Sequence, residues 1–154
     1  MEITILTVGK IRDASVASLC ADYIGRLGRW HDIRTVEVRD EPGSRPEKQV
    51  LAAEADRIRE KLPAGALAVA LAREGKALSS TELAGWLGKT LEQGRSRVCF
   101  VIGGPLGLAR SVVESCDLTL SLSKLTLPHE LARLVLLEQL YRANTILRGE
   151  PYHK

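Results

Sequence analysis

Apolar residues recur with two different periods along this chain, one typical of strands and one typical of helices, and segments of the two kinds alternate. Residues 2–8 alternate at about every second position, as in a half-buried strand, and residues 14–27 carry apolar side chains at helical spacing. Residues 67–71 and 97–102 are continuous apolar runs, which are typical of strands buried on both faces of a sheet. In full, the pattern predicts strands over residues 2–8, 33–38, 67–71, 97–102 and 118–122, and helices over residues 14–27, 47–62, 80–91, 108–115 and 128–147.

The alternation of strands with helices predicts an α/β fold with a mainly parallel sheet flanked by helices. The chain of 154 residues contains no internal repeat, low-complexity tract or linker, so we expect a single domain over residues 1–154. Residues 73–76 (REGK) are expected to form a polar loop after the third strand.

The last predicted helix, over residues 128–147, is apolar on most of its circumference. A helix of this kind is normally buried on all sides, and a single small domain has difficulty in covering it. We therefore expect two copies of the chain to form a homodimer. Glu138 and Arg142 interrupt the apolar surface at a spacing of four, at which two side chains on one helix face can pair.

Composition and charge narrow the class of protein. A formal net charge of +3 permits RNA as a partner without demonstrating it. No apolar run reaches the roughly 18 residues of a membrane-spanning helix, and the first residues resemble a strand more than a signal peptide. We therefore expect no membrane association and a cytoplasmic location. Cysteines 20, 99 and 116 lack metal-ligand spacing, so we expect no metal site and three structural thiols.

Three loops follow strands at the edge where open α/β sheets bind ligands. They begin after Leu71, after residue 102 and after Leu122. The second loop contains glycines 103, 104 and 107, which let the backbone approach a flat ligand closely. A tight strand-to-helix connection with no ligand explains these glycines equally well. Because they do not form the dinucleotide pattern GxGxxG, an NAD-dependent oxidoreductase ranks low.

The third loop, residues 123–127, mixes small polar residues with leucines. Its backbone groups could hydrogen-bond the edge of an adenine while the leucines cover the ring. Alternatively, Thr126 only helps to begin the helix at Pro128. His129 comes next, and a histidine at this place is more commonly a structural or capping residue.

The chain ends with Tyr152, His153 and Lys154, and terminal residues are usually disordered unless something holds them. On an exposed helix, the Glu138–Arg142 pair would also be a routine surface contact. From these residues alone, neither group can be assigned a function.

Three motifs together change this picture. VIGGPLG at 101–107, LSKLTLPHELAR at 122–133, and EQLYRA with GEPYHK between 138 and 154 closely resemble the ribosomal RNA large subunit methyltransferase H family, which are small SPOUT-class enzymes. The resemblance covers the whole chain. It implies a C-terminal trefoil knot, S-adenosylmethionine as methyl donor, and a homodimer in which the tail of one subunit reaches towards the cofactor of its partner.

The resemblance also implies roles for particular residues. It places the methyl donor at Leu71, Gly103, Leu122, Ser123, Lys124, Leu125, Thr126 and Leu127, and it connects Arg142, Tyr152 and His153 with substrate binding or catalysis. The implied reaction is methylation of ring nitrogen 3 of a pseudouridine in a hairpin loop of large-subunit (23S) rRNA, on the assembled ribosome. We expect His153, or in second place His129, to accept the proton, with Arg142 stabilising the developing oxygen charge and Glu138 beside it. The alternative is a non-catalytic dimer that keeps the fold and binds RNA or the ribosome.

Overall fold

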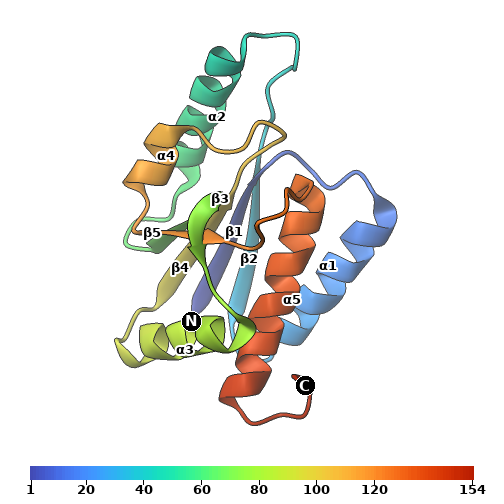
Figure 1. The fold of residues 1–154 in the computed structure, drawn as a ribbon, viewed down its shortest axis with the longest axis vertical. Helices are drawn as coiled ribbons and strands as arrows, with labels where there is room; N and C mark the ends of the chain where they lie inside the picture. Colours follow the sequence, from blue (N-terminus) through green and yellow to red (C-terminus); the bar gives the residue numbers. More distant parts are fainter.

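Five parallel strands form one sheet in the order β2-β1-β4-β3-β5, and helices cover both of its faces (Figure 1). The computed structural model describes residues 1–154. The strands are β1 (Glu2–Val8), β2 (Asp32–Val38), β3 (Leu67–Ala77), β4 (Arg97–Ile102) and β5 (Leu118–Ser121), and the helices are α1 (Ala14–Leu27), α2 (Glu47–Lys61), α3 (Ser80–Glu92), α4 (Arg110–Ser115) and α5 (His129–Leu147). The predicted α/β class with a parallel sheet is confirmed.

The alternation within β1 explains why the molecule has three layers. Ile3 and Ile5 point to one face and join the larger core, which α1, α3 and α5 cover. Leu6 and Val8 point to the other face and join a smaller core under α2 and α4. Strand β4 alternates in the same way, so the central strands are buried on both faces, as their continuous apolar sequences predict.

The prediction of a polar loop at residues 73–76 is wrong, because β3 continues to Ala77. Its register against β5 shifts between Leu71 and Lys76, so residues 73–75 lie within an irregularity and Lys76 and Ala77 pair with β5 again. A Cβ atom on Gly75 would lie 2.7 Å from the carbonyl carbon of Leu120, so only glycine fits at this approach of two backbones. The pairing partner decides this conformation, and the local sequence contains no sign of it.

Helix α5 lies against the sheet between α1 and α3 (Figure 1). Leu136, Leu137 and Leu140 in its middle are fully buried within one chain. Leu131 and Leu147 near its ends stay exposed, at 42% and 40%. A single chain therefore covers the middle of this helix better than its composition suggests, and leaves apolar surface at both ends.

A buried arginine fixes the first half of α5 to the sheet. The guanidinium group of Arg133 donates to the Thr7 hydroxyl, to the carbonyl oxygen of Gly9 at 3.2 Å and to Glu37 at 2.8 Å. Since Thr7 and Glu37 lie near the carboxyl ends of β1 and β2, this contact positions the beginning of α5 at the edge where ligands bind in such sheets.

The cysteines are arranged as expected for structural thiols. Cys20 and Cys99 are buried, and Cys116 is half-buried. Burial raises the pKa of all three thiols, that of Cys99 to about 12, so they are protonated at neutral pH. No cluster of three or more His, Cys, Asp or Glu side chains is placed to hold a metal ion. None of the helices has the length and apolar character needed to cross a membrane.

Candidate active site

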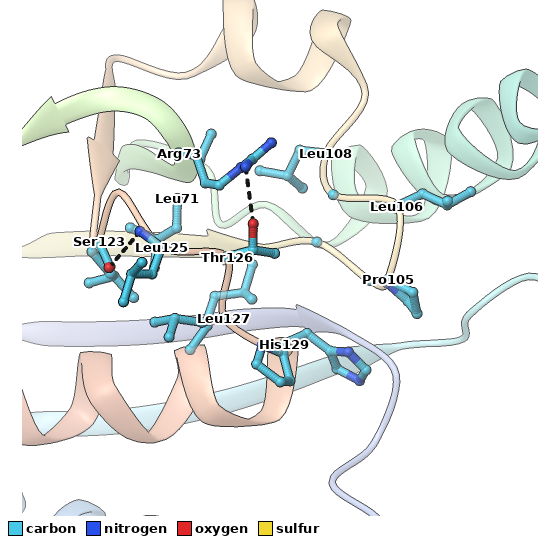
Figure 2. A pocket seen from close by; sticks show the side chains of 18 of the residues that line it. Leu71, Arg73, Pro105, Leu106, Leu108, Ser123, Leu125, Thr126, Leu127 and His129 are labelled. Atoms are coloured by element: carbon cyan, nitrogen blue, oxygen red, sulfur yellow. Dashed lines mark hydrogen bonds between the residues drawn. The ribbon is translucent and has the colours of Figure 1, made fainter.

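A cavity of about 680 Å³ opens beside the irregular part of β3 and at the carboxyl ends of β4 and β5. Its walls come from the irregular part of β3, from the loops that follow β4 and β5, and from the first turn of α5 (Figure 2). The lining comprises residues 71–74, 102–108, 122–123 and 125–129, with Ala132. The size falls within the usual range for small-molecule sites, roughly 300–1,000 Å³.

The glycine loop between β4 and α4 forms a tight turn at the wall of this cavity. The amide of Gly107 donates to the carbonyl oxygen of Gly104 at 2.9 Å, and Gly107 has a φ of 77°, which favours glycine. A Cβ atom on Gly103 would overlap the backbone of Gly107. The turn by itself therefore requires two of the three glycines, and the same loop lines the cavity with bare backbone.

Hydrogen bonds shape the opposite wall, the loop after β5. The Ser121 hydroxyl donates to the carbonyl oxygen of Ser123 at 2.9 Å, and the Ser123 hydroxyl accepts from the Leu125 amide at 2.9 Å. Across the opening, Arg73 Nη1 donates to the Thr126 hydroxyl at 3.0 Å (Figure 2). Leu125, 74% exposed, lines the opening of the cavity.

The structure brings most of the sequence-predicted cofactor residues together. Leu71, Gly103, Leu122, Ser123, Leu125, Thr126 and Leu127 all line the cavity. Lys124 belongs to the same loop but its exposed side chain is not part of the lining. His129 is half-buried and lines the cavity from the first turn of α5.

The remaining candidates form a second cluster at the other end of α5. Glu138 accepts a hydrogen bond from Arg142 Nε at 3.0 Å and another from the Tyr152 hydroxyl at 3.1 Å. The Tyr152 hydroxyl also lies 3.2 Å from that of Tyr23 on α1. Arg142 lies over the Tyr152 ring, and its Nη1 is 3.3 Å from His153 Nδ1. These contacts hold the C-terminal tail against the helix.

Electrostatics in this cluster favour a neutral phenol beside a paired cation. Burial, together with hydrogen bonds to Tyr23 and Glu138, raises the pKa of Tyr152. The hydrogen bond to Glu138 raises the pKa of Arg142. At neutral pH Tyr152 is therefore a hydrogen-bond donor, and Arg142 keeps its positive charge.

Within one chain the cavity lies far from the cluster that Glu138, Arg142, Tyr152 and His153 form at the other end of α5. Arg142 follows His129 by thirteen positions on the same helix, which corresponds to about 20 Å at the helical rise of 1.5 Å per residue. The last side chains therefore do not reach the cavity of their own chain, and the resemblance places them instead at the cofactor of a partner subunit. A shared site requires the tail of a second copy.

Two residues of these sites were not singled out from the sequence. Arg73 lies in β3 after half-buried Ala72, and its place at the end of the apolar run was the available signal. Tyr23 lies on α1, far along the chain from Tyr152, and nothing in the sequence connects the two.

Comparison with known proteins supports a methyl-transfer site. The family model described as predicted SPOUT methyltransferase matches residues 1–153. Proteins named ribosomal RNA large subunit methyltransferase H are 47% identical in Listeria monocytogenes serotype 4a, 43% in Carboxydothermus hydrogenoformans and 44% in Gemmatimonas aurantiaca, with the whole of both chains covered in each case.

Solved structures resemble the fold at lower sequence identity. A probable methyltransferase from Bordetella pertussis Tohama I has a TM-score of 0.56 and 20% identity, with 92% of this chain and 95% of the other covered. A probable methylase family protein from Haemophilus influenzae Rd KW20 has a TM-score of 0.55 and 15% identity, with 99% of this chain and 70% of the other covered. These likenesses support the fold alone.

Together these matches confirm the resemblance seen in the three sequence motifs. The methyl donor of such enzymes is S-adenosylmethionine. On the family model and on relatives that match along their full length, this chain belongs to the SPOUT methyltransferases, in the family of ribosomal RNA large subunit methyltransferase H.

Proposed function

We propose that this protein transfers a methyl group to ring nitrogen 3 of a pseudouridine in a hairpin loop of large-subunit (23S) rRNA, on the assembled ribosome in the cytoplasm. The single observation that carries the proposal is the full-length match to rRNA large subunit methyltransferases at 43% to 47% identity. The names of the relatives specify large-subunit rRNA, and the nucleotide and the ring position are the further step that we propose.

The cavity beside β3 and at the ends of β4 and β5 fits S-adenosylmethionine. Leu71 and Leu127 offer apolar walls for the flat adenine, and Gly103 offers a wall without side chains. Loop 122–127 supplies backbone amides and carbonyls, and Lys124, with an exposed side chain, is its one residue outside the lining. When bound, the sulfonium supplies an electrophilic methyl group, and the protein orients it.

The target nitrogen carries a proton between two carbonyl groups and must lose it as the methyl group arrives. A positioned base contributes roughly 10²–10⁴-fold to such a step. We assign the proton to His153, with His129 in the cavity wall as the second candidate. Arg142 then stabilises the negative charge that develops on the adjacent oxygen, and Tyr152, a neutral phenol that donates to Glu138, holds the tail in place.

The resting contact between Arg142 and His153 has a consequence for this step. Arginine only donates hydrogen bonds, so Nδ1 of His153 accepts and the neutral ring carries its proton on Nε2. The substrate must therefore displace this 3.3 Å contact before the imidazole can take up a proton. Glu138 stays occupied by Arg142, Tyr152 and Gln139 and serves as a positioning group.

A homodimer is part of the proposal, because the cofactor cavity lies about 20 Å along α5 from the tail cluster, which comprises Glu138, Arg142, Tyr152 and His153. One subunit would supply the cavity and its partner would supply Arg142, Tyr152 and His153. The exposed Leu19, Leu131 and Leu147 are apolar surface available for the pairing. A target base can reach such a shared site only when it is splayed out of the RNA, which a hairpin loop allows at low cost.

The C-terminal trefoil knot implied by the family is also part of the proposal. It is supported by the close passage of Gly75 over the backbone of β5 and by the two loops of 103–108 and 122–128 that line one cavity. A crystal structure in which the backbone path between the two termini is unknotted would refute this part of the proposal.

The experiment that tests the function is mass spectrometry of rRNA nucleosides from cells with and without this chain. Loss of one methylated pseudouridine, restored by the wild-type gene, supports the proposal. A variant with His153→Ala that restores the modification at the wild-type rate refutes the assigned proton acceptor. Calorimetry with S-adenosylmethionine tests the alternative of a non-catalytic binder, which need not take up the donor.

A further inference from the structure

All arginine–aromatic stacks of this chain lie in one place, where the last turns of α1 and α5 meet. Such stacks occur about once per 70–80 residues in proteins, so their concentration in one cluster needs an explanation. The pairs are Arg26 with Tyr23 and Tyr141, Arg142 with Tyr152, and both Arg29 and Arg148 with Trp30.

Two arginines of this cluster share one ring. The guanidinium carbons of Arg29 and Arg148 lie 4.8 and 4.7 Å from the centroid of Trp30. The Trp30 ring in turn stacks on Tyr141 at 5.6 Å with an interplanar angle of 20°, and Tyr141 is buried in α5. The two cations are thus held on a ring that the core fixes in place.

The same two arginines have no carboxylate partner. Arg26 and Arg142 form salt bridges with Asp22 and Glu138, whereas Arg29 and Arg148 form none, although both are exposed. Arg29 Nε donates only to a backbone carbonyl at 3.4 Å, and Arg148 Nη1 to the Asn144 side-chain oxygen at 3.2 Å. Most of their N–H groups therefore remain free for an external anion.

We propose that Arg29 and Arg148, ordered on Trp30, contact phosphate groups of the RNA next to the nucleotide that the C-terminal tail handles. The inference rests on the proposed function. Arginine forks match phosphate oxygens, and holding them on a ring reduces the entropy lost on binding. Tyr141 contacts both Trp30 and Tyr152, at 5.6 and 4.8 Å between ring centroids, so the phosphate contact is continuous with the tail.

A second copy of the chain is the less favourable occupant of this surface. Identical residues of two subunits face each other at the axis of a two-fold interface, so an axis through this patch would set the unpaired arginines against each other. RNA has no such conflict, because each phosphate carries a negative charge.

The test compares R29Q/R148Q with the wild-type protein in methyl transfer to ribosomal large subunits over a series of salt concentrations. We expect the KM for ribosomal substrate to rise at least about 10-fold, with kcat and the affinity for S-adenosylmethionine unchanged. The slope of log kcat/KM against log salt should become less steep by about 1.4, because two phosphate contacts to single-stranded RNA are lost. R29K/R148K, which keeps the charge, should recover most of the slope.

Arg95→Gln is the matched control, because Arg95 is also exposed and forms neither a salt bridge nor an aromatic stack. A double variant that behaves like this control overturns the proposal. So does a change of mass in sedimentation, which would assign the surface to a second copy.

Filter binding of ribosomal subunits separates this proposal from the function on which it rests. If the wild-type protein binds subunits more tightly than R29Q/R148Q but transfers no methyl group, the proposed function is refuted and the RNA contact of Arg29 and Arg148 is supported. Equal binding by both proteins overturns the surface, whether or not methyl transfer occurs.

Discussion

The hydroxyl groups of Tyr23 and Tyr152 lie 3.2 Å apart, although 129 positions separate these residues along the chain. Tyr152 donates its proton to Glu138 at 3.1 Å, so the Tyr23 hydroxyl donates to Tyr152. The two bonds tie the C-terminal tail to α1 and to α5 at once. The tail is therefore an ordered part of the structure.

Removal of the Tyr23 hydroxyl should loosen the tail without changing the cofactor cavity. For Tyr23→Phe we expect methyl transfer to fall about 3- to 10-fold, since a hydrogen bond of this kind contributes about 1 kcal/mol, with unchanged affinity for S-adenosylmethionine. The check is a double-mutant cycle with Tyr152→Phe. If the two hydroxyls act through each other, the double variant loses little more than Tyr152→Phe alone, and full additivity would contradict this relationship.

Mixed dimers test whether the site is shared between subunits. His153→Ala removes the tail function and Leu127→Asp places a charge in the cavity wall, so each homodimer should be inactive. Random pairing of equal amounts makes half the dimers mixed, and each of those has one complete shared site, so about a quarter of wild-type activity should return. A tail that serves its own chain would leave the mixture inactive, which is the opposing outcome.

The contact of Arg73 with Thr126 spans the opening of the cavity at 3.0 Å. Arg73→Ala should leave the opening looser and weaken binding of S-adenosylmethionine by about 5-fold, which corresponds to about 1 kcal/mol. Isothermal calorimetry measures the affinity directly, with Arg95→Ala as a control for the loss of a positive charge. An affinity equal to that of the control would show that the bridge does not shape the bound state.

Gly75 tests the passage of β3 over β5. A Cβ atom at this position would meet the backbone of Leu120 at 2.7 Å, and backbone cannot move away as a flexible side chain can. We expect Gly75→Ala to lower the free energy of unfolding by about 2 kcal/mol or more. Gly85→Ala is the matched control, because that position in α3 has open space and alanine favours the helix by roughly 0.5–1 kcal/mol. Urea denaturation compares both, and equal effects would contradict the close approach.

His31 should make stability depend on pH. It is 7% exposed, its Nε2 donates to the Asn144 side-chain oxygen at 2.8 Å, and its Nδ1 has no partner. Burial lowers its pKa below the ordinary 6.5, against the opposing effect of the bond to Asn144. The unfolded chain therefore binds more protons below pH 6.5, so this contribution to stability is present above 6.5 and is lost as the pH falls from there towards the folded pKa.

His31→Gln keeps an N–H for Asn144 but does not titrate. The free energy of unfolding of this variant should change less between about pH 7 and about pH 5 than that of the wild-type protein. Urea denaturation at a series of pH values gives the slope for each. Identical slopes would show that another group carries the pH dependence.

The sequence by itself determined the elements, the class of fold and the family. The continuous apolar runs of β3 and β4 predicted central strands, and Asp13 and Ser79 cap α1 and α3 through their side chains. All three segments predicted to follow strands line the cavity, although the first of them belongs to β3 and is not a loop. These features are encoded locally, because periodicity and capping depend on residues close together in the chain.

The tertiary structure alone decided which of the predicted residues share a site. The extension of β3 past residues 73–76 depends on β5 as a neighbour, and the tie between Tyr23 and Tyr152 depends on the packing of α1 against α5. The length of α5 then separates His129 from Arg142 and places the cavity and the tail cluster at opposite ends of one helix. The order of motifs along the sequence does not predict the distance between them in space, because proximity in a fold comes from strand pairing and helix packing between distant segments.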